Sequence, residues 1–148
     1  MCQIDTDADL LEKRSKQWNV KTSYTDYRDL LSNKDIDAVE VITPHHLHAE
    51  IGKAALKAGK HVSIQKPMAI NIPDCDDLID TAERSGKLLR VFENFRYYPP
   101  MVKAKQLLDD GSIGEPLSIR IKVVQGVGGD DWEIPYRRWK WRFDPAQG

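Results

Sequence analysis

Residues 38–67 carry the pattern that decides the fold, and they read AVEVITPHHLHAEIGKAALKAGKHVSIQKP. The opening run, residues 38–42, is short, rich in valine and isoleucine and typical of a buried strand. Helical spacing i, i+3, i+4, i+7 follows in the apolar residues Ile51, Ala54, Ala55 and Ala58. Gly59 is a helix stop signal, and residues 61–64 indicate a second strand. The stretch therefore predicts a strand, a helix and another strand.

The same rhythm continues on both sides of this stretch. Downstream, a helix with Cys75, Leu78, Ile79 and Ala82 on one face is closed by Gly86, and residues 88–92 form the next predicted strand. Upstream, two more helical faces are predicted, one with Ala8, Leu11, Ser15 and Trp18 and one with Tyr27, Leu30 and Leu31. Such alternation implies parallel strands joined by right-handed crossovers, with helices on both faces of the sheet. We predict an α/β class with a Rossmann-like, doubly wound parallel sheet; another α/β fold is the alternative.

A second domain is predicted to begin after this unit. Beyond Pro99 and Pro100 the sequence indicates one helix, with Met101, Ala104 and Leu108 on a face, and then a half-exposed strand from about residue 117 to 124. We place a first domain at residues 1–97 and the start of a second at 98–148. The Trp-rich and Arg-rich tail, residues 126–148, is interpreted as core or interface packing rather than as a base-stacking surface.

Composition limits the classes of partner. The 148 residues include 22 Lys and Arg against 23 Asp and Glu, a formal net charge of -1, so the whole chain has no electrostatic attraction to nucleic acid or to an anionic membrane. No apolar run of about 18 residues suggests a membrane span. The two cysteines, Cys2 and Cys75, fit neither a zinc pair nor a disulfide framework, and we interpret both as buried packing residues in a reducing compartment. A cytoplasmic protein is expected.

Three polar segments follow the predicted strands, at residues 43–48, 65–67 and 93–97. Ligands of open parallel sheets bind beyond the carboxyl ends of the strands, so these segments are expected at one edge. A lysine and an asparagine aimed into one crevice could hydrogen-bond a carboxamide and a hydroxyl. A Lys-Pro pair is, however, more often a simple strand terminus. The cluster His45, His46 and His48 has metal-ligand residue types, but the first two are adjacent and cannot share a helical face, so no metal is expected.

At this point the chain resembles the Gfo/Idh/MocA family, the family of glucose-fructose oxidoreductase and inositol dehydrogenase. Residues 36–49 resemble the family pattern DAV.I.TP...H, and residues 59–67 resemble GKHV..EKP. Later landmarks of the family match the segments Asn94-Phe95-Arg96-Tyr97, Ile113-Gly114-Glu115-Pro116 and Trp141-Arg142-Phe143-Asp144. Five motifs in the right order cover essentially the whole chain, which makes the resemblance specific.

The resemblance implies hydride transfer between a nicotinamide cofactor, NAD or NADP, and a sugar, polyol or related hydroxyl compound, in a protein expected to be a homo-oligomer. It also implies that residues 1–97 are a partial dinucleotide-binding domain and that residues 98–148 begin a substrate and oligomerisation domain. Lys66 would be catalytic, placed between nicotinamide and the reacting hydroxyl, where its charge favours developing alkoxide character. The implied cofactor-binding residues are Asp5, Thr43, Pro44, His48, Gln65, Lys66, Pro67 and Asn94. The implied substrate-binding residues are Lys66, Arg96, Tyr97, Trp141 and Arg142. The peptide between Lys66 and Pro67 is expected to be cis.

Three departures from the family pattern qualify this expectation. The family's glycine fingerprint would lie about 30 residues before Met1, and Gln3 stands where an acidic ribose ligand is usual, with Asp5 as a displaced candidate. The family's proton-transfer histidine would lie beyond Gly148. Gln65 replaces the customary glutamate beside Lys66. We therefore expect a fragment that binds NAD(P) weakly or not at all and has no activity alone. A non-catalytic cofactor- or ligand-binding protein is the alternative, and a metal hydrolase built on the histidines is a third hypothesis.

Overall fold

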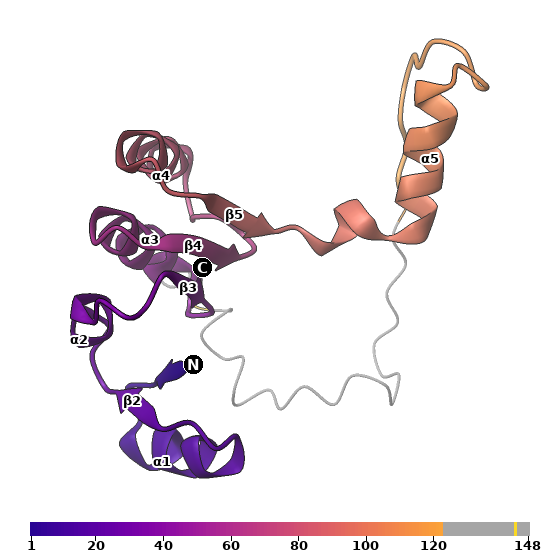
Figure 1. The fold of residues 1–148 in the computed structure, drawn as a ribbon. Helices are drawn as coiled ribbons and strands as arrows, with labels where there is room; N and C mark the ends of the chain where they lie inside the picture. Colours follow the sequence, from indigo (N-terminus) through magenta and orange to yellow (C-terminus); the bar gives the residue numbers. More distant parts are fainter. Residues whose placement is uncertain (123–143, 145–148) are drawn as a thin grey trace.

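The computed structural model describes residues 1–122 and residue 144. Strands and helices alternate through this part, as predicted (Figure 1). Their order is β1 (Cys2–Ile4), α1 (Ala8–Gln17), β2 (Thr22–Tyr24), α2 (Tyr27–Ser32), β3 (Ala38–Val41), η1 (His45–Leu47), α3 (His48–Lys57), β4 (His61–Gln65), α4 (Ile72–Ser85), β5 (Leu89–Phe92), η2 (Asn94–Tyr97) and α5 (Pro99–Asp109). The predicted α/β class with Rossmann-like parallel strands is confirmed.

All strand pairs are parallel, and they form two sheets. One sheet holds β1 and β2, and the other has the order β3-β4-β5. In the larger sheet Val39 is in register with Val62, and Val62 with Leu89. α3 and α4 pack together against one face of this sheet (Figure 1). The carboxyl ends of β3, β4 and β5 therefore meet at one edge, as the sequence predicts.

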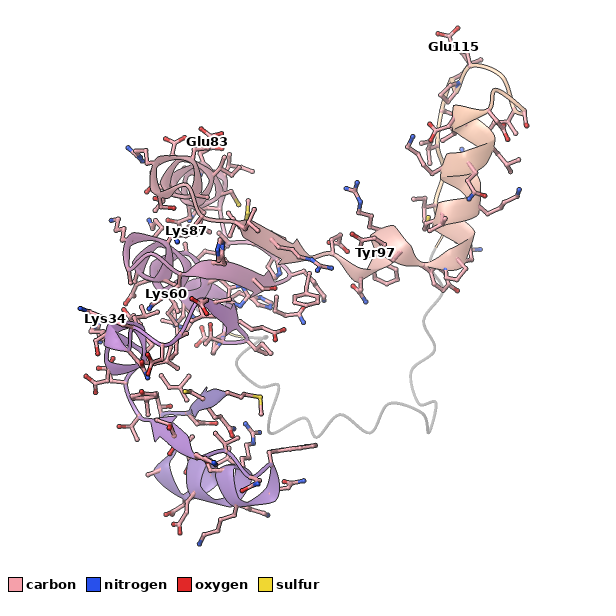
Figure 2. The ribbon with its side chains drawn as sticks, viewed as in Figure 1. Lys34, Lys60, Glu83, Lys87, Tyr97 and Glu115 are labelled. Carbon is pink, nitrogen blue, oxygen red and sulfur yellow. The ribbon has the colours of Figure 1, made fainter. Side chains whose placement is uncertain are left out.

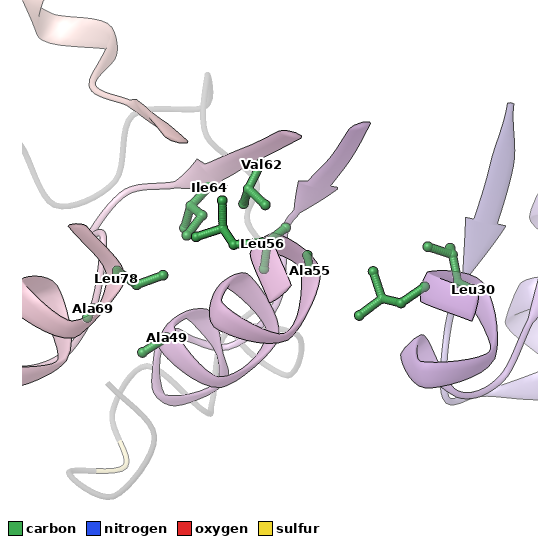
Figure 3. Packing of buried hydrophobic residues seen from close by; sticks show 10 residues of the cluster. Leu30, Ala49, Ala55, Leu56, Val62, Ile64, Ala69 and Leu78 are labelled. Atoms are coloured by element: carbon green, nitrogen blue, oxygen red, sulfur yellow. The ribbon is translucent and has the colours of Figure 1, made fainter. Parts of the chain in front are cut away.

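The core lies between this sheet and its helices, and α2 extends it toward β1 and β2. Val62 and Ile64 point from β4 to Leu56 of α3 and Leu78 of α4, with Leu30 of α2 farther along the same layer (Figure 3). Ile64, Leu56 and Leu78 are completely buried. Period-2 alternation on the strands and helical spacing on α3 and α4 turn these apolar residues to one common side.

Helix ends follow the local chemistry of the sequence. Asp7, Asp26 and Asn71 each cap a helix by accepting a hydrogen bond from a backbone N–H in its first turn. The predicted stop at Gly86 is confirmed, because this residue ends α4 with a left-handed φ of 64°. Within the part of the chain that the structure describes, no helix is long and apolar enough to cross a membrane.

Three expectations about the elements are corrected, and one strand was missed. The described part of the predicted strand 117–124 forms no strand, and Leu117, Ile119 and Ile121 are 95%, 74% and 64% exposed. No described segment pairs with it, and alternation alone does not hold a strand without a ladder partner. Trp18 caps α1 and is 64% exposed instead of packed. Cys2 and Cys75 are half-buried at the core's margin instead of buried. The short strand β2 was not predicted.

Candidate active site at the carboxyl end of the sheet

Three loops bring the predicted site residues to the same edge of the β3-β4-β5 sheet. The loop with Thr43 follows β3, Lys66 follows β4, and Asn94 follows β5. Because β4 is hydrogen-bonded to both neighbours in parallel, Lys66 lies in the middle of the three. Backbone N–H groups and side chains beyond the carboxyl ends of parallel strands are the usual ligand-binding groups of such sheets.

Lys66 offers an ammonium group that the described structure leaves available. Its side chain is half-buried, and no hydrogen bond or ion pair joins its Nζ to any described residue. Its backbone N–H donates to Gln65 Oε1 at 2.9 Å. The peptide between Lys66 and Pro67 is cis, as the family resemblance suggests. A positive charge at this edge can stabilise negative charge that develops on a bound oxygen.

Thr43 and Pro44 form the start of the first loop, and both are half-buried. Thr43 Oγ1 donates to the carbonyl oxygen of Pro44 at 3.4 Å, a long contact that leaves the hydroxyl able to bind a ligand. η1 then leads into α3, whose first residue is His48.

His48 lies behind this loop instead of on its surface. It is completely buried. Its Nδ1 is 2.7 Å from the carbonyl oxygen of Pro67, and its Nε2 is 2.9 Å from the carbonyl oxygen of Thr43. Both polar atoms of the ring therefore face backbone. The residue types of the sequence identified His48, but these two partners could not be foreseen from spacing.

The remaining predicted residues lie in two other places. Asn94, Arg96 and Tyr97 share η2, and all three are exposed; Figure 2 shows Tyr97 on the segment that leads from β5 to α5. Asp5 follows β1 in the smaller sheet, where Oδ2 pairs with Arg14 Nη1 at 3.3 Å and Oδ1 accepts from the Asp7 N–H at 3.1 Å. The Asp5 carboxylate is thus already engaged. Trp141 and Arg142 lie outside the described residues.

One residue of the GKHV motif has a structural position that sequence reasoning missed. Lys60 is only 6% exposed, and its Nζ donates to the backbone carbonyl of Asn33 at 2.7 Å (Figure 2 labels Lys60). Asn33 in turn donates from Nδ2 to the Tyr24 hydroxyl at 3.0 Å. This chain of hydrogen bonds ties the start of β4 to the end of α2 and to β2. The sequence signal was the lysine directly after the helix stop.

No group of three potential metal ligands is gathered among the described residues. Two shallow hollows occur elsewhere: one of about 360 Å³ along α1, and one of about 380 Å³ beside α3 whose lining includes His46, Lys53 and Asp74. Neither is lined by Lys66 or Asn94. The candidate site is instead defined by the loops of Thr43, Lys66 and Asn94, which meet at one edge of the sheet, because an open sheet edge need not form a deep hollow by itself.

The known proteins with similar sequences include several dehydrogenases. The chain is 31% identical over 143 residues to levoglucosan dehydrogenase of Pseudarthrobacter phenanthrenivorans, a match that covers 96% of this chain and 35% of that protein. It is 35% identical over 113 residues to inositol 2-dehydrogenase of Salmonella typhimurium, covering 76% of this chain and 34% of that protein. The chain thus spans about a third of the length of these relatives.

Solved structures and a family model agree with this. An NAD binding oxidoreductase from Klebsiella pneumoniae is 33% identical with a TM-score of 0.71, over 78% of this chain and 30% of that one. Levoglucosan dehydrogenase in complex with NADH and levoglucosan is 30% identical with a TM-score of 0.70, over 76% of this chain and 30% of that one. The model of the oxidoreductase family with an NAD-binding Rossmann fold matches residues 1–93. The chain therefore belongs to the Gfo/Idh/MocA oxidoreductase family.

Proposed function

We propose that this chain supplies the nicotinamide end of the active site of an NAD- or NADP-dependent oxidoreductase that acts on a sugar, a polyol or a related hydroxyl compound. The observation that carries the proposal is Lys66: its ammonium, which has no partner among the described residues, belongs to the loop at the carboxyl end of the middle strand, between the loops of Thr43 and Asn94. Two relatives are named as dehydrogenases of levoglucosan and of inositol, which supports the proposed substrate class.

Each residue has a role that follows from its position or from the family resemblance. Lys66 is the catalytic residue: its charge would stabilise negative charge on the substrate oxygen, and a nicotinamide held at this edge would supply the hydride chemistry. Thr43, Pro44, Gln65 and Pro67 line the cofactor on both sides of β4, and Asn94 closes the crevice beside β5. Arg96, Tyr97, Trp141 and Arg142 bind substrate hydroxyls. Asp5 reaches the cofactor ribose only if it releases Arg14.

The phosphate end of the cofactor has no counterpart in the described residues. Glycines with positive φ, at positions 59, 86, 111 and 114, lie at or beyond helix ends instead of between a strand and a helix start. A pyrophosphate is normally held by backbone N–H groups of such a strand-to-helix turn. The 148-residue chain alone should therefore bind NAD(P) weakly or not at all and should not turn over substrate.

The domain division and the assembly belong to the same proposal. Residues 1–97 form part of the dinucleotide-binding domain, and residues 98–148 begin the substrate and oligomerisation domain. In support, α5 packs on η2 and stands apart from the sheet in Figure 1. We expect the protein to form a homo-oligomer.

A chimaera tests the proposal. The 143 matched residues of this chain replace the corresponding part of levoglucosan dehydrogenase, and NADH production is measured with levoglucosan and with inositol. We expect turnover with at least one of them, and Lys66→Met should lower kcat by roughly 100-fold or more, the usual effect of losing one electrostatic stabiliser. Lys57→Met is the matched control, because Lys57 is exposed on α3.

The same assay separates the alternative function. A cofactor- or ligand-binding protein without turnover is favoured by Gln65, which replaces the glutamate of the family pattern beside the catalytic lysine. A chimaera that saturates with NADH but produces none from any substrate supports this alternative. Turnover that survives Lys66→Met unchanged contradicts the role of Lys66.

A further inference from the structure

His48 contacts two of the three loops of the candidate site at once. One ring nitrogen faces the carbonyl oxygen of Pro67, next to Lys66, and the other faces that of Thr43. The two carbonyls belong to loops that follow different strands, β4 and β3. The ring thus spans the two loops from behind, in a position that is inaccessible to solvent.

The chemistry of the ring restricts what this contact can be. A carbonyl oxygen only accepts hydrogen bonds, and a neutral imidazole has one N–H and one lone pair. At 2.7 and 2.9 Å both contacts have hydrogen-bond length, so a neutral ring would set a lone pair against one oxygen. The ring therefore donates to at least one of the two carbonyls, and its other nitrogen lies against the second.

We propose that His48 is a positioning residue that clamps the Thr43 and Pro67 carbonyls, with one ring nitrogen against each, and thereby sets where Lys66 stands. The clamp consists of His48, Thr43 and Pro67 and rests on their geometry alone. Only the effect of this clamp on catalysis by Lys66 rests on the proposed function. Substrate and cofactor touch Lys66 and the loop surfaces, and His48 acts through them.

The surroundings hold the ring in place. His48 is the first residue of α3, directly after the turn that follows the loop of Thr43, and the His45 ring stands edge-on with its centroid 5.6 Å away. Because the ring is completely buried, removing it takes away a partner from each carbonyl at a position that solvent does not reach.

Solution NMR on the 148-residue chain tests the clamp without cofactor. We expect nuclear Overhauser contacts from the His48 ring to both Thr43 and Pro67, and a slowly exchanging ring N–H coupled across a hydrogen bond to one of their carbonyl carbons. A ring without these contacts, or without such a coupling, overturns the proposal. Cofactor binding enters neither measurement, so failure here leaves the proposed function standing.

Amide hydrogen exchange gives a second readout on His48→Gln, whose side-chain amide carries its donors on one atom and cannot span both carbonyls. The reporter amides are Lys66, bonded to Gln65 Oε1, and Leu47, bonded to the Pro44 carbonyl. Both should exchange about tenfold faster, the factor expected for one lost hydrogen bond.

Two controls separate a clamp from general loosening of the fold. The amides of His61 and Val62, which bond across to residues 37 and 88, should keep their exchange rates in His48→Gln. His46→Gln removes a histidine from the same turn, outside the clamp, and should leave the Lys66 amide unchanged. Equal acceleration of the reporter and control amides, or unchanged reporters in a folded His48→Gln, contradicts the positioning role.

Discussion

At the scale of single residues, the site depends on positions whose neighbours are close in space and distant in sequence. The residue types Lys66, Thr43 and Asn94 could be selected from the sequence because strand ends of parallel sheets attract ligands. The contacts of His48 could not, because its partner Pro67 lies 19 residues away and belongs to another loop. The engagement of Asp5 by Arg14 likewise depends on how α1 returns over β1.

Gly52 provides a prediction at this scale. A methyl group on Gly52 would lie 2.8 Å from Ile64 Cδ1 and 2.9 Å from Leu78 Cδ2, both in completely buried side chains. Overpacking costs about 1 to 3 kcal/mol, and the better helix propensity of alanine returns roughly 1 kcal/mol. Gly52→Ala should therefore lower the free energy of unfolding by about 1 kcal/mol in urea titration.

The matched control for Gly52 is Lys57→Ala on the same helix, at an exposed position, which should change that free energy by less than about 0.5 kcal/mol. A stabilised Gly52→Ala variant would show that α3 can retreat from β4 without loss, contrary to the close packing described.

At the scale of elements, the predictable parts are those with both periodicity and a burial partner. β3, α3, β4, α4 and β5 were predicted because each turns a regular apolar face to one core. β2 has three residues, two of them exposed, so it carries too little pattern to be recognised. Residues 117–122 show the opposite failure, since alternation is present and no described strand pairs with them. Local sequence cannot show whether a segment finds a pairing strand that lies far away along the chain.

A hydrogen bond between Tyr27 of α2 and Glu50 of α3 gives a prediction for the pH dependence of stability. The Tyr27 hydroxyl donates to Glu50 Oε1 at 2.6 Å. This hydrogen bond, followed by burial, raises the pKa of Tyr27 above its ordinary value of 10.0. A folded-state pKa above the unfolded one means that the stabilisation is complete below about pH 10 and is lost as the pH rises through the raised pKa.

Tyr27→Phe should therefore be less stable by about 0.5 to 1 kcal/mol at pH 7, with a difference that shrinks above pH 10. Urea unfolding at pH 7 and at alkaline pH measures this. Tyr98→Phe is the control, because Tyr98 is 51% exposed, and it should behave as the unmodified chain at pH 7. A constant difference across pH would rule out the hydrogen bond as its cause.

At the scale of the whole molecule, the chain presents one end of the proposed cofactor site. The described strands form two sheets, and β1 and β3 each pair on one side only within them. The larger sheet carries Lys66 and the loops of the nicotinamide end, whereas no described turn offers a phosphate cradle. Relatives three times as long include an enzyme solved with NADH. We therefore propose that this chain supplies a share of the site rather than the whole.

Calorimetric titration of the 148-residue chain with NADH and with NADPH tests this division most directly, with sedimentation on the same sample to establish its oligomeric state. Loss of several charge-assisted hydrogen bonds to the pyrophosphate, at roughly 1.5 to 3 kcal/mol each, removes orders of magnitude in affinity. We expect the binding isotherm to show no saturation up to about millimolar NADH or NADPH. Binding by the monomer at micromolar concentration would contradict it, because the phosphates would then have a site within these residues.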